Sequence, residues 1–170
     1  MKLYIIDDHA LFRNGLISLL ESRQISGQAA SSPEQGLLEI PSLSLDVILL
    51  DLRMPTMSGV EVLKSLKSKN IQTPIVMLTT STEENDLRNC LKHGAQGYLL
   101  KDMDPDELVD ALNEVSKGSI VVAQDMTHVL AKVLRNELTD SEPSFDSLTN
   151  REKEVSCQVA IGHSNKVIAR

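Results

Sequence analysis

The sequence has few aromatic residues, few cysteines and no long hydrophobic run. Tryptophan is absent and aromatic residues make up 2% of the 170-residue chain, so we expect a mainly aliphatic core. Cys90 and Cys157 offer neither a metal-ligand spacing nor a disulfide framework. No apolar run approaches the roughly 18 residues of a membrane-spanning helix, and no leader pattern is present. We therefore expect a reduced, cytoplasmic protein with no membrane partner.

The chain also lacks a surplus of positive charge. It has 17 basic and 24 acidic side chains, a net charge of −7, which gives no general attraction to nucleic acid or anionic membranes. The remaining composition, 41% hydrophobic and 24% charged, is typical of a globular protein. The length allows one full domain and a smaller second one, or a single larger domain.

Short apolar segments alternate with segments of helical periodicity over residues 1–118. Buried strands are expected at 3–6, 28–30, 47–50, 75–78 and 97–100. Ser32-Pro33 has the pattern of a helix N-cap followed by proline at the first helical position, and the last helix of this part, expected at 104–117, begins with Asp104-Pro105. Five strand–helix units in succession predict an α/β fold with a parallel sheet and helices on both faces.

Polar residues follow four of the five expected strands. Asp7 and Asp8 follow the first, Asp51 the third, Thr79 the fourth and Lys101 the fifth. A lone aspartate after a strand more often caps a helix or shapes a loop. The ends of parallel strands share one edge of the sheet, however, so these side chains are expected to converge.

Crowded carboxylates repel one another unless a cation joins them, and Mg²⁺ is the natural candidate because it prefers carboxylate and water oxygens. Asp51 is then placed to act as a nucleophile and form an aspartyl-phosphate. Lys101 and the Thr79 hydroxyl would contact the phosphoryl oxygens.

Four segments carry a family resemblance: IIDDHALFRNGL, ILLDLRMPTMSGVEVL, IVMLTTS and GYLLKDMDPDEL. Together they resemble the receiver domain of two-component response regulators, over residues 1–118. The resemblance implies a flavodoxin-like (βα)5 fold with a central parallel five-stranded sheet in the order 2-1-3-4-5.

The resemblance also implies roles for individual residues. Asp51 would be the phosphoacceptor, and Mg²⁺ would bind Asp8 directly and Asp7 through water, with Asp51 and the backbone carbonyl of Arg53 as further ligands. Thr79 would be the switch hydroxyl and Lys101 the phosphate-binding lysine. Tyr98 matches the aromatic position whose rotamer follows the switch hydroxyl; the alternative is an ordinary half-buried strand tyrosine.

Asp102 stands where many receivers have a proline after the lysine. The KDM sequence and the DDH start instead resemble the NarL/FixJ family, the branch with LuxR-type output domains that includes the nitrate/nitrite regulators. A cis bond before Asp102, if present, would have to be held by its surroundings, because only proline makes the cis form cheap.

Enzyme families fit less well, and the chain is not expected to be an enzyme. A phosphatase of the haloacid-dehalogenase type needs a second aspartate two residues after the nucleophile, where this chain has Arg53. Neither a P-loop nor a dinucleotide-binding glycine motif is present.

The four histidines, His9, His93, His128 and His163, show no ligand spacing and are expected on the surface or in loops.

The C-terminal part predicts a linker and the start of a second domain. Met126, Val129, Leu130, Val133 and Leu134 have the spacing of an amphipathic helix, and residues 136–147 are polar, contain Pro143 and suggest a linker. Residues 148–170 resemble the opening of a LuxR-type, all-α helix-turn-helix domain. There Thr149 and Glu152 form a capping box, and Ser164 caps a second helix.

The predicted organisation is a receiver domain at 1–118, a linker with an amphipathic helix at 119–147, and a helix-turn-helix fragment at 148–170. We expect a response regulator that a sensor histidine kinase phosphorylates to control transcription, with dimerisation on phosphorylation. The sequence printed here ends before the recognition helix that reads DNA in this family, so its DNA-binding residues are unknown. The alternative is a receiver-only switch that binds partners without binding DNA.

Overall fold

The computed structural model describes the backbone of residues 1–140 and the side chains of residues 1–135. The chain divides after Ala131, and the two parts are described separately. The strands of the first part are β1 (Lys2–Ile6), β2 (Ser26–Ala30), β3 (Val47–Asp51), β4 (Ile75–Thr79), β5 (Gly97–Leu100) and β6 (Val121–Val122). Its helices are α1 (Ala10–Ser22), α2 (Pro33–Glu39), α3 (Gly59–Ser68), α4 (Glu84–Lys92) and α5 (Pro105–Ser116), with 3-10 turns η1 (Ile40–Ser42) and η2 (Gln124–Met126).

The strands form one parallel sheet in the order β2-β1-β3-β4-β5-β6. All five predicted strands are present and the flavodoxin-like order is confirmed. The sheet has one strand more than predicted, because Val121 and Val122 pair with Gly97 and Tyr98 of β5. A two-residue strand is too short to show a sequence period, and it lies beyond Gly118, where the receiver domain was predicted to end.

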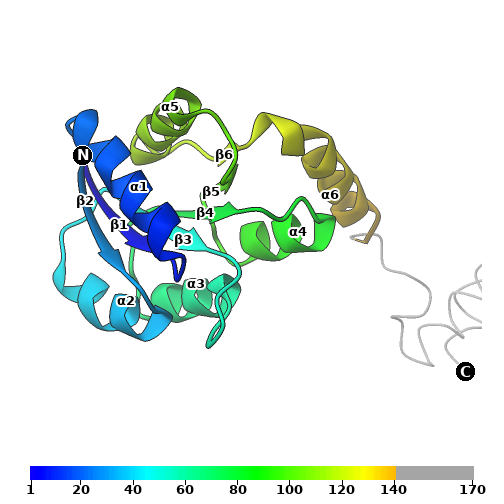
Figure 1. Cartoon of the computed structure of the whole chain (residues 1–170). Helices are drawn as coiled ribbons and strands as arrows, with labels where there is room; N and C mark the ends of the chain where they lie inside the picture. The colour runs from blue at the N-terminus through cyan, green and yellow to red at the C-terminus, as the bar shows by residue number, and fades with distance from the viewer. Residues whose placement is uncertain (141–170) are drawn as a thin grey trace, which may run out of the picture. The chain divides into compact units, whose positions relative to one another are not determined.

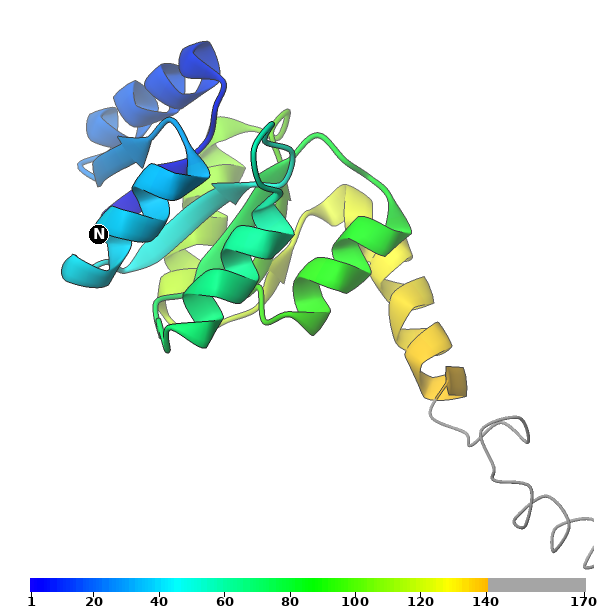
Figure 2. The same cartoon turned by 90° about the horizontal axis from the view of Figure 1, so that it is seen from below.

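Helices cover both faces of the sheet, with α1 and α5 on one face and α2, α3 and α4 on the other (Figures 1 and 2). Every residue of β3, β4 and β5 is buried, as expected for parallel strands covered on both sides. Alternate strand residues pack against α1 and α5 in one cluster: Leu3, Ile5, Val47, Leu49, Val76, Leu78 and Leu99, with Leu16, Leu20, Leu108, Leu112 and Val115 from the two helices. The core is aliphatic except for Tyr4 and Tyr98, which are both buried.

Local sequence signals fix where the helices begin. The Ser32 hydroxyl accepts a hydrogen bond from the Gln35 N–H at 3.3 Å, and Asp104 caps α5 by accepting from the Asp106 N–H at 2.8 Å. The predicted N-cap at Ser32 is therefore confirmed, and α5 begins at the predicted Asp-Pro pair with Asp104 as its cap. At the start of α3, Ser58 forms a capping box with Glu61, a reciprocal pair of hydrogen bonds that satisfies two otherwise unpaired donors.

Gly59 allows α3 to begin directly beside the end of β3. Its N–H donates to the Leu52 carbonyl at 2.9 Å, and a Cβ at this position would lie 2.2 Å from the Asp51 carbonyl oxygen. Only glycine permits so close an approach of two backbones. This contact holds the loop that follows Asp51 against the strand.

The predicted amphipathic helix forms α6 (Thr127–Asp140), which crosses the division of the chain at Ala131. Met126 and Val129, on the expected apolar face, are buried in the first part. The helix continues to Asp140, so the predicted linker at 136–147 was wrong over its first five residues. No glycine or proline occurs between Ala123 and Pro143 to end the helix earlier. The predicted helix-turn-helix fragment lies outside the described residues.

None of the helices within residues 1–140 is both long enough and apolar enough to cross a bilayer.

Candidate functional site

Four of the predicted site residues meet at one edge of the sheet. Asp7 follows β1, Asp51 ends β3, Thr79 ends β4 and Lys101 follows β5, so the parallel strand order brings them together. Asp7, Asp51 and Thr79 are the buried polar residues of the described part of the chain, with Asp7 only 2% and Asp51 only 4% exposed. Charged groups are rarely buried unless they are paired, so this edge of the sheet is a candidate site.

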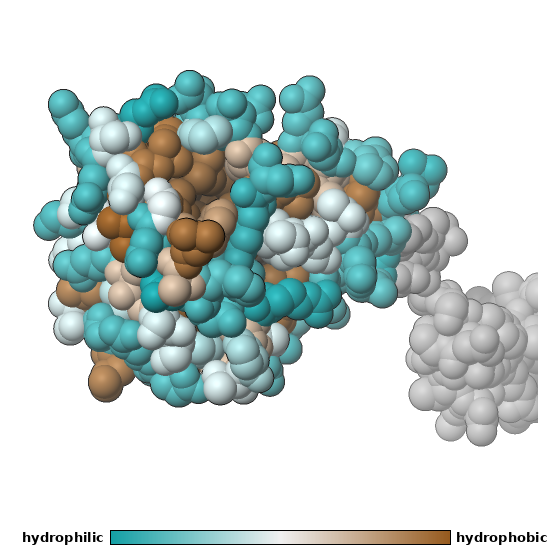
Figure 3. Space-filling view, in the orientation of Figure 1, coloured by the Kyte–Doolittle hydropathy of each residue, from teal (hydrophilic) through white to brown (hydrophobic). Residues whose placement is uncertain are grey.

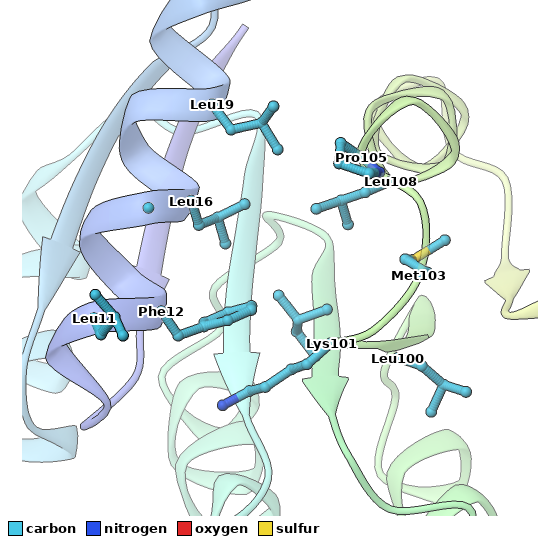
Figure 4. A pocket seen from close by; sticks show the side chains of 11 residues that line it. Leu11, Phe12, Leu16, Leu19, Leu100, Lys101, Met103, Pro105 and Leu108 are labelled. Atoms are coloured by element: carbon cyan, nitrogen blue, oxygen red, sulfur yellow. The ribbon is translucent and has the colours of Figure 1, made fainter.

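Lys101 joins the two buried carboxylates. Its Nζ lies 2.8 Å from Asp7 Oδ2 and 2.8 Å from Asp51 Oδ2. The other oxygen of each carboxylate accepts a backbone hydrogen bond, from the His9 N–H to Asp7 at 2.8 Å and from the Arg53 N–H to Asp51 at 3.3 Å. The lysine side chain passes the Phe12 ring, whose centroid is 4.8 Å from Nζ (Figure 4).

Burial and the nearby opposite charge shift the pKa values of Asp51 and Lys101 in opposite directions. Burial raises the pKa of Asp51, the ion pair with Lys101 opposes that rise, and the nearby Asp7 adds to it, so the pKa stays above its ordinary value. Burial alone would lower the pKa of Lys101, but its hydrogen bonds to Asp51 and Asp7 outweigh this effect and raise the pKa. The lysine is therefore held as a cation between the carboxylates.

The acidic group fits a divalent cation. Asp7, Asp8, His9 and Asp51 each offer a ligand atom, and these atoms all lie within 4.8 Å of one another. Asp8 Oδ1 is buried and has no hydrogen-bond partner among the described residues, although His9 Nδ1 lies 3.4 Å away. Leaving a buried carboxylate oxygen unpaired is costly, and an oxygen-rich donor set of this kind can hold a metal ion.

Arg53 and Thr79 have the positions expected for them, while their functions stay predictions. The Arg53 backbone lies beside Asp51 through the N–H bond described above, and its carbonyl remains a predicted metal ligand. The Thr79 hydroxyl oxygen accepts a hydrogen bond from the Ser81 N–H at 3.0 Å. The Lys101–Asp102 peptide bond is trans, as are all peptide bonds in the described part of the chain.

Tyr98 is completely buried rather than half-buried. Its hydroxyl donates a hydrogen bond to the Ser81 carbonyl at 2.9 Å, and burial raises the pKa of the phenol above its usual range. The side chain is thus tied to the loop that begins at Thr79. Whether its rotamer follows the threonine stays a prediction.

Sequence reasoning missed an ion-pair and hydrogen-bond network that links the loop after Asp51 to α4. Asp86 Oδ2 lies 2.5 Å from Arg53 Nη2 and 2.5 Å from the Ser81 hydroxyl. Asp86 lies in the first turn of a largely polar helix, where an acidic residue is common for its favourable interaction with the helix dipole. Nothing in the local pattern separates it from its acidic neighbour Glu84.

Two hollows adjoin the lysine. The first, about 400 Å³, is lined by Asp51, Arg53 and Lys101 together with His9, Phe12, Thr80 and Asp102. The second, about 240 Å³, lies between α1 and the start of α5, and its walls are mostly apolar, among them Leu11, Leu16, Met103 and Leu108 (Figure 4). Hydrophobic side chains gather on the surface around this second hollow (Figure 3). Phe12 and Lys101 line both hollows, so the apolar hollow lies next to the one that contains Asp51.

Comparison with known proteins places this geometry in a family. Residues 3–113 match the model of the response regulator receiver domain. The chain is 42% identical over 169 residues to the nitrate/nitrite response regulator protein NarL of Escherichia coli, with 98% of this chain and 78% of that protein covered. It is 37% identical over 171 residues to a nitrate/nitrite response regulator protein homolog of Haemophilus influenzae, covering 99% of this chain and 80% of that protein.

Solved structures agree in fold. The signal receiver domain of the putative response regulator NarL from Mycobacterium tuberculosis is 33% identical, with a TM-score of 0.64 over 69% of this chain and 96% of that one. A LuxR-family two-component response regulator from Aurantimonas reaches a TM-score of 0.72 over 77% of this chain and 95% of that one; at 24% identity, this match supports the fold alone.

The fold and the acidic edge of the sheet thus define a receiver domain. The chain belongs to the response regulators of two-component systems, in the branch related to the nitrate/nitrite regulators, whose members control transcription.

Proposed function

We propose that Asp51 accepts a phosphoryl group from a sensor histidine kinase and that the resulting aspartyl-phosphate switches the regulator. The observation that carries this proposal is the Lys101 cation held 2.8 Å from Asp51 at the edge of a 400 Å³ cavity. A buried carboxylate beside a fixed cation and an open cavity can receive an anionic group whose charge the cation then neutralises.

In the transfer, a carboxylate oxygen of Asp51 attacks the phosphorus of the kinase phosphohistidine. The new P–O bond forms as the P–N bond breaks, and the electron pair of that bond returns to the imidazole nitrogen of the donor. The Lys101 ammonium then exchanges its contact with the Asp51 carboxylate for one with the phosphoryl oxygens. Its ion pair with Asp7 keeps it at the site during this exchange. The Thr79 hydroxyl can donate a hydrogen bond to another phosphoryl oxygen.

Asp7, Asp8 and Asp51, with the Arg53 carbonyl, would hold Mg²⁺, which when bound neutralises the repulsion between the carboxylates and attracts the phosphoryl oxygens. The unpaired Asp8 Oδ1 supports this part of the proposal. Without a cation, this oxygen would stay buried at a cost in stability.

The signal leaves the site through the β4–α4 loop. Movement of Thr79 toward the phosphoryl group would pull on the Ser81 N–H that it accepts from, and Ser81 is bonded in turn to Tyr98 and Asp86. A change at Asp51 thereby reaches α4 and β5. We propose that this change promotes dimerisation and controls DNA binding, as the relationship to transcription regulators supports.

The test is phosphorylation of the full chain by a small acyl-phosphate donor in the presence of Mg²⁺, followed by intact-protein mass spectrometry. We expect the wild-type protein to gain one phosphoryl group that hydroxylamine removes, and Asp51→Asn to gain none. Asp110→Asn serves as the matched control, because Asp110 is an exposed aspartate of α5 outside the site. Hydroxylamine-sensitive labelling of Asp51→Asn would overturn the assignment.

A further inference from the structure

Arg53 lies between the cavity that contains Asp51 and the first turn of α4. It lines the cavity together with Asp51 and Lys101, while its Nη2 lies 2.5 Å from Asp86 Oδ2. We propose that Arg53 exchanges ion-pair partners when Asp51 is phosphorylated: the guanidinium leaves Asp86 and binds the phosphoryl oxygens. Asp86 is then a competing anion that weakens the hold of the site on the phosphoryl group. This proposal rests on the proposed function, because it requires a phosphoryl group on Asp51.

The backbone of Arg53 is fixed beside Asp51, while its side chain can move. The Arg53 N–H donates to Asp51 Oδ1 at 3.3 Å, which holds the base of the side chain at the wall of the cavity. The side chain itself is 62% exposed, so no packed core surrounds it. Exposed side chains change rotamer rapidly. The guanidinium can therefore turn from α4 toward the cavity without any repacking of the protein.

Charge favours the phosphoryl group as the partner of Arg53. In the unphosphorylated protein, Lys101 already pairs with both Asp51 and Asp7. A phosphoryl group adds up to about two negative charges near neutral pH, more than the single charge of Asp86. Lys101 cannot neutralise this charge alone while it stays paired with Asp7. The planar guanidinium of arginine matches phosphate oxygens in pairs, so Arg53 can supply the second cation.

Asp86 can lose Arg53 without becoming unpaired. Its carboxylate also accepts a hydrogen bond from the Ser81 hydroxyl at 2.5 Å, and its place in the first turn of α4 lets the helix dipole stabilise its charge. An ion pair with so exposed an arginine is weak, so the exchange costs little. The departure of Arg53 would also release α4 from the loop after β3, by a route separate from Thr79.

The experiment measures binding of beryllofluoride, a stable mimic of the phosphoryl group, to the full chain with Mg²⁺ by ¹⁹F nuclear magnetic resonance. The variants are Arg53→Gln, Asp86→Asn and the two combined. Arg53→Gln removes the cation but keeps the backbone carbonyl, and Asp86→Asn keeps an oxygen for the Ser81 hydroxyl. Glu84→Gln is the matched control, since it removes another carboxylate from the first turn of α4, one that pairs with Arg88. Circular dichroism confirms that each variant is folded.

We expect Arg53→Gln to bind beryllofluoride on the order of fivefold more weakly than the wild type, because a charge-assisted contact is lost and the cost of breaking the Asp86 pair is saved. Asp86→Asn should bind it roughly two- to fivefold more tightly, the range for an exposed ion pair that no longer competes. Glu84→Gln should bind it as the wild type does. The combined variant should match Arg53→Gln, since Asp86 then has no arginine to withhold.

Wild-type affinity in Arg53→Gln would overturn the exchange of partners. So would weaker binding by Asp86→Asn, a gain of equal size in Glu84→Gln, or an effect of Asp86→Asn that persists without Arg53. In each of these cases, labelling of Asp51 by an acyl-phosphate donor would leave the proposed function standing. If the wild type neither binds beryllofluoride nor accepts a phosphoryl group on Asp51, both proposals fail.

Discussion

Asp51 combines two properties that oppose each other, reactivity and burial. The carboxylate keeps its charge in a buried position only because Lys101 lies beside it, and even so burial raises its pKa above the ordinary value. A carboxyl group with a raised pKa binds its proton more tightly in the folded than in the unfolded protein. Its ionised form therefore lowers stability at pH values above the ordinary carboxyl pKa.

Asp51→Asn should accordingly stabilise the metal-free protein near neutral pH, because the amide removes the buried charge and Lys101 keeps its bond to Asp7. We expect a rise in Tm of roughly 2–4 °C, about 1 kcal/mol for a chain of this size. The advantage should shrink as the pH falls and Asp51 of the wild type becomes protonated. Thermal denaturation across pH measures this change.

Mg²⁺ provides the internal control for this comparison. An ion that binds only the folded protein stabilises it by RT ln(1 + [ion]/Kd) and so raises its Tm. Mg²⁺ should therefore stabilise the wild type more than Asp51→Asn and reduce the difference between them. A lower Tm for the variant at neutral pH without metal would contradict the claim that burial dominates at Asp51.

At the scale of elements, the β4–α4 loop is held between two parts of the site. Asp86 binds both Arg53, from the loop after β3, and the Ser81 hydroxyl. Asp86→Ala should release the loop, with faster amide hydrogen exchange over residues 80–84 and a stability loss of about 1 kcal/mol. Exchange in β3 and β4 should not change.

Glu84→Ala is the matched control for Asp86→Ala. Both substitutions remove an acidic residue from the first turn of α4, but Glu84 pairs with Arg88 of the same helix. The control therefore removes a first-turn carboxylate and its interaction with the helix dipole while the Asp86 contacts with Arg53 and Ser81 stay in place. Equal exchange in the two variants would mean that the Asp86 contacts do not hold the loop.

The elements of the sheet were predictable because four of the five predicted strands are apolar runs that end at, or just before, a polar residue of distinct chemistry. The apolar run ending at Asp51 specifies both a buried strand and the position of its carboxylate. Two features could not be predicted: β6, which consists of only two residues, and Asp86, whose partners are 5 and 33 positions away. Such long-range side-chain contacts leave no period in a single sequence. His9 was expected on the surface, and only the fold reveals the carboxylates beside its exposed ring.

At the scale of the whole molecule, the position of the apolar hollow relative to Asp51 bears on how a kinase delivers its phosphoryl group. The hollow shares Phe12 and Lys101 with the cavity that contains Asp51, so a protein donor that reaches Asp51 comes within reach of the hollow. Leu11 is 91% exposed and lines the hollow together with other apolar side chains, and a contiguous apolar surface of this kind often marks a protein–protein contact, whereas a single exposed leucine does not.

Leu11→Asp should therefore weaken phosphotransfer from the sensor kinase by roughly tenfold, about 1.4 kcal/mol of transition-state binding. Labelling by a small acyl-phosphate donor should not change, because such a donor needs only Asp51 and the residues around it. Leu38→Asp is the matched control, since Leu38 is 81% exposed on α2, on the opposite face of the sheet from α1. Rates of transfer from the phosphorylated kinase distinguish the two surfaces. Equal rates for both variants would exclude the hollow as the docking surface, whereas a defect with both donors would indicate damage to the Asp51 site itself.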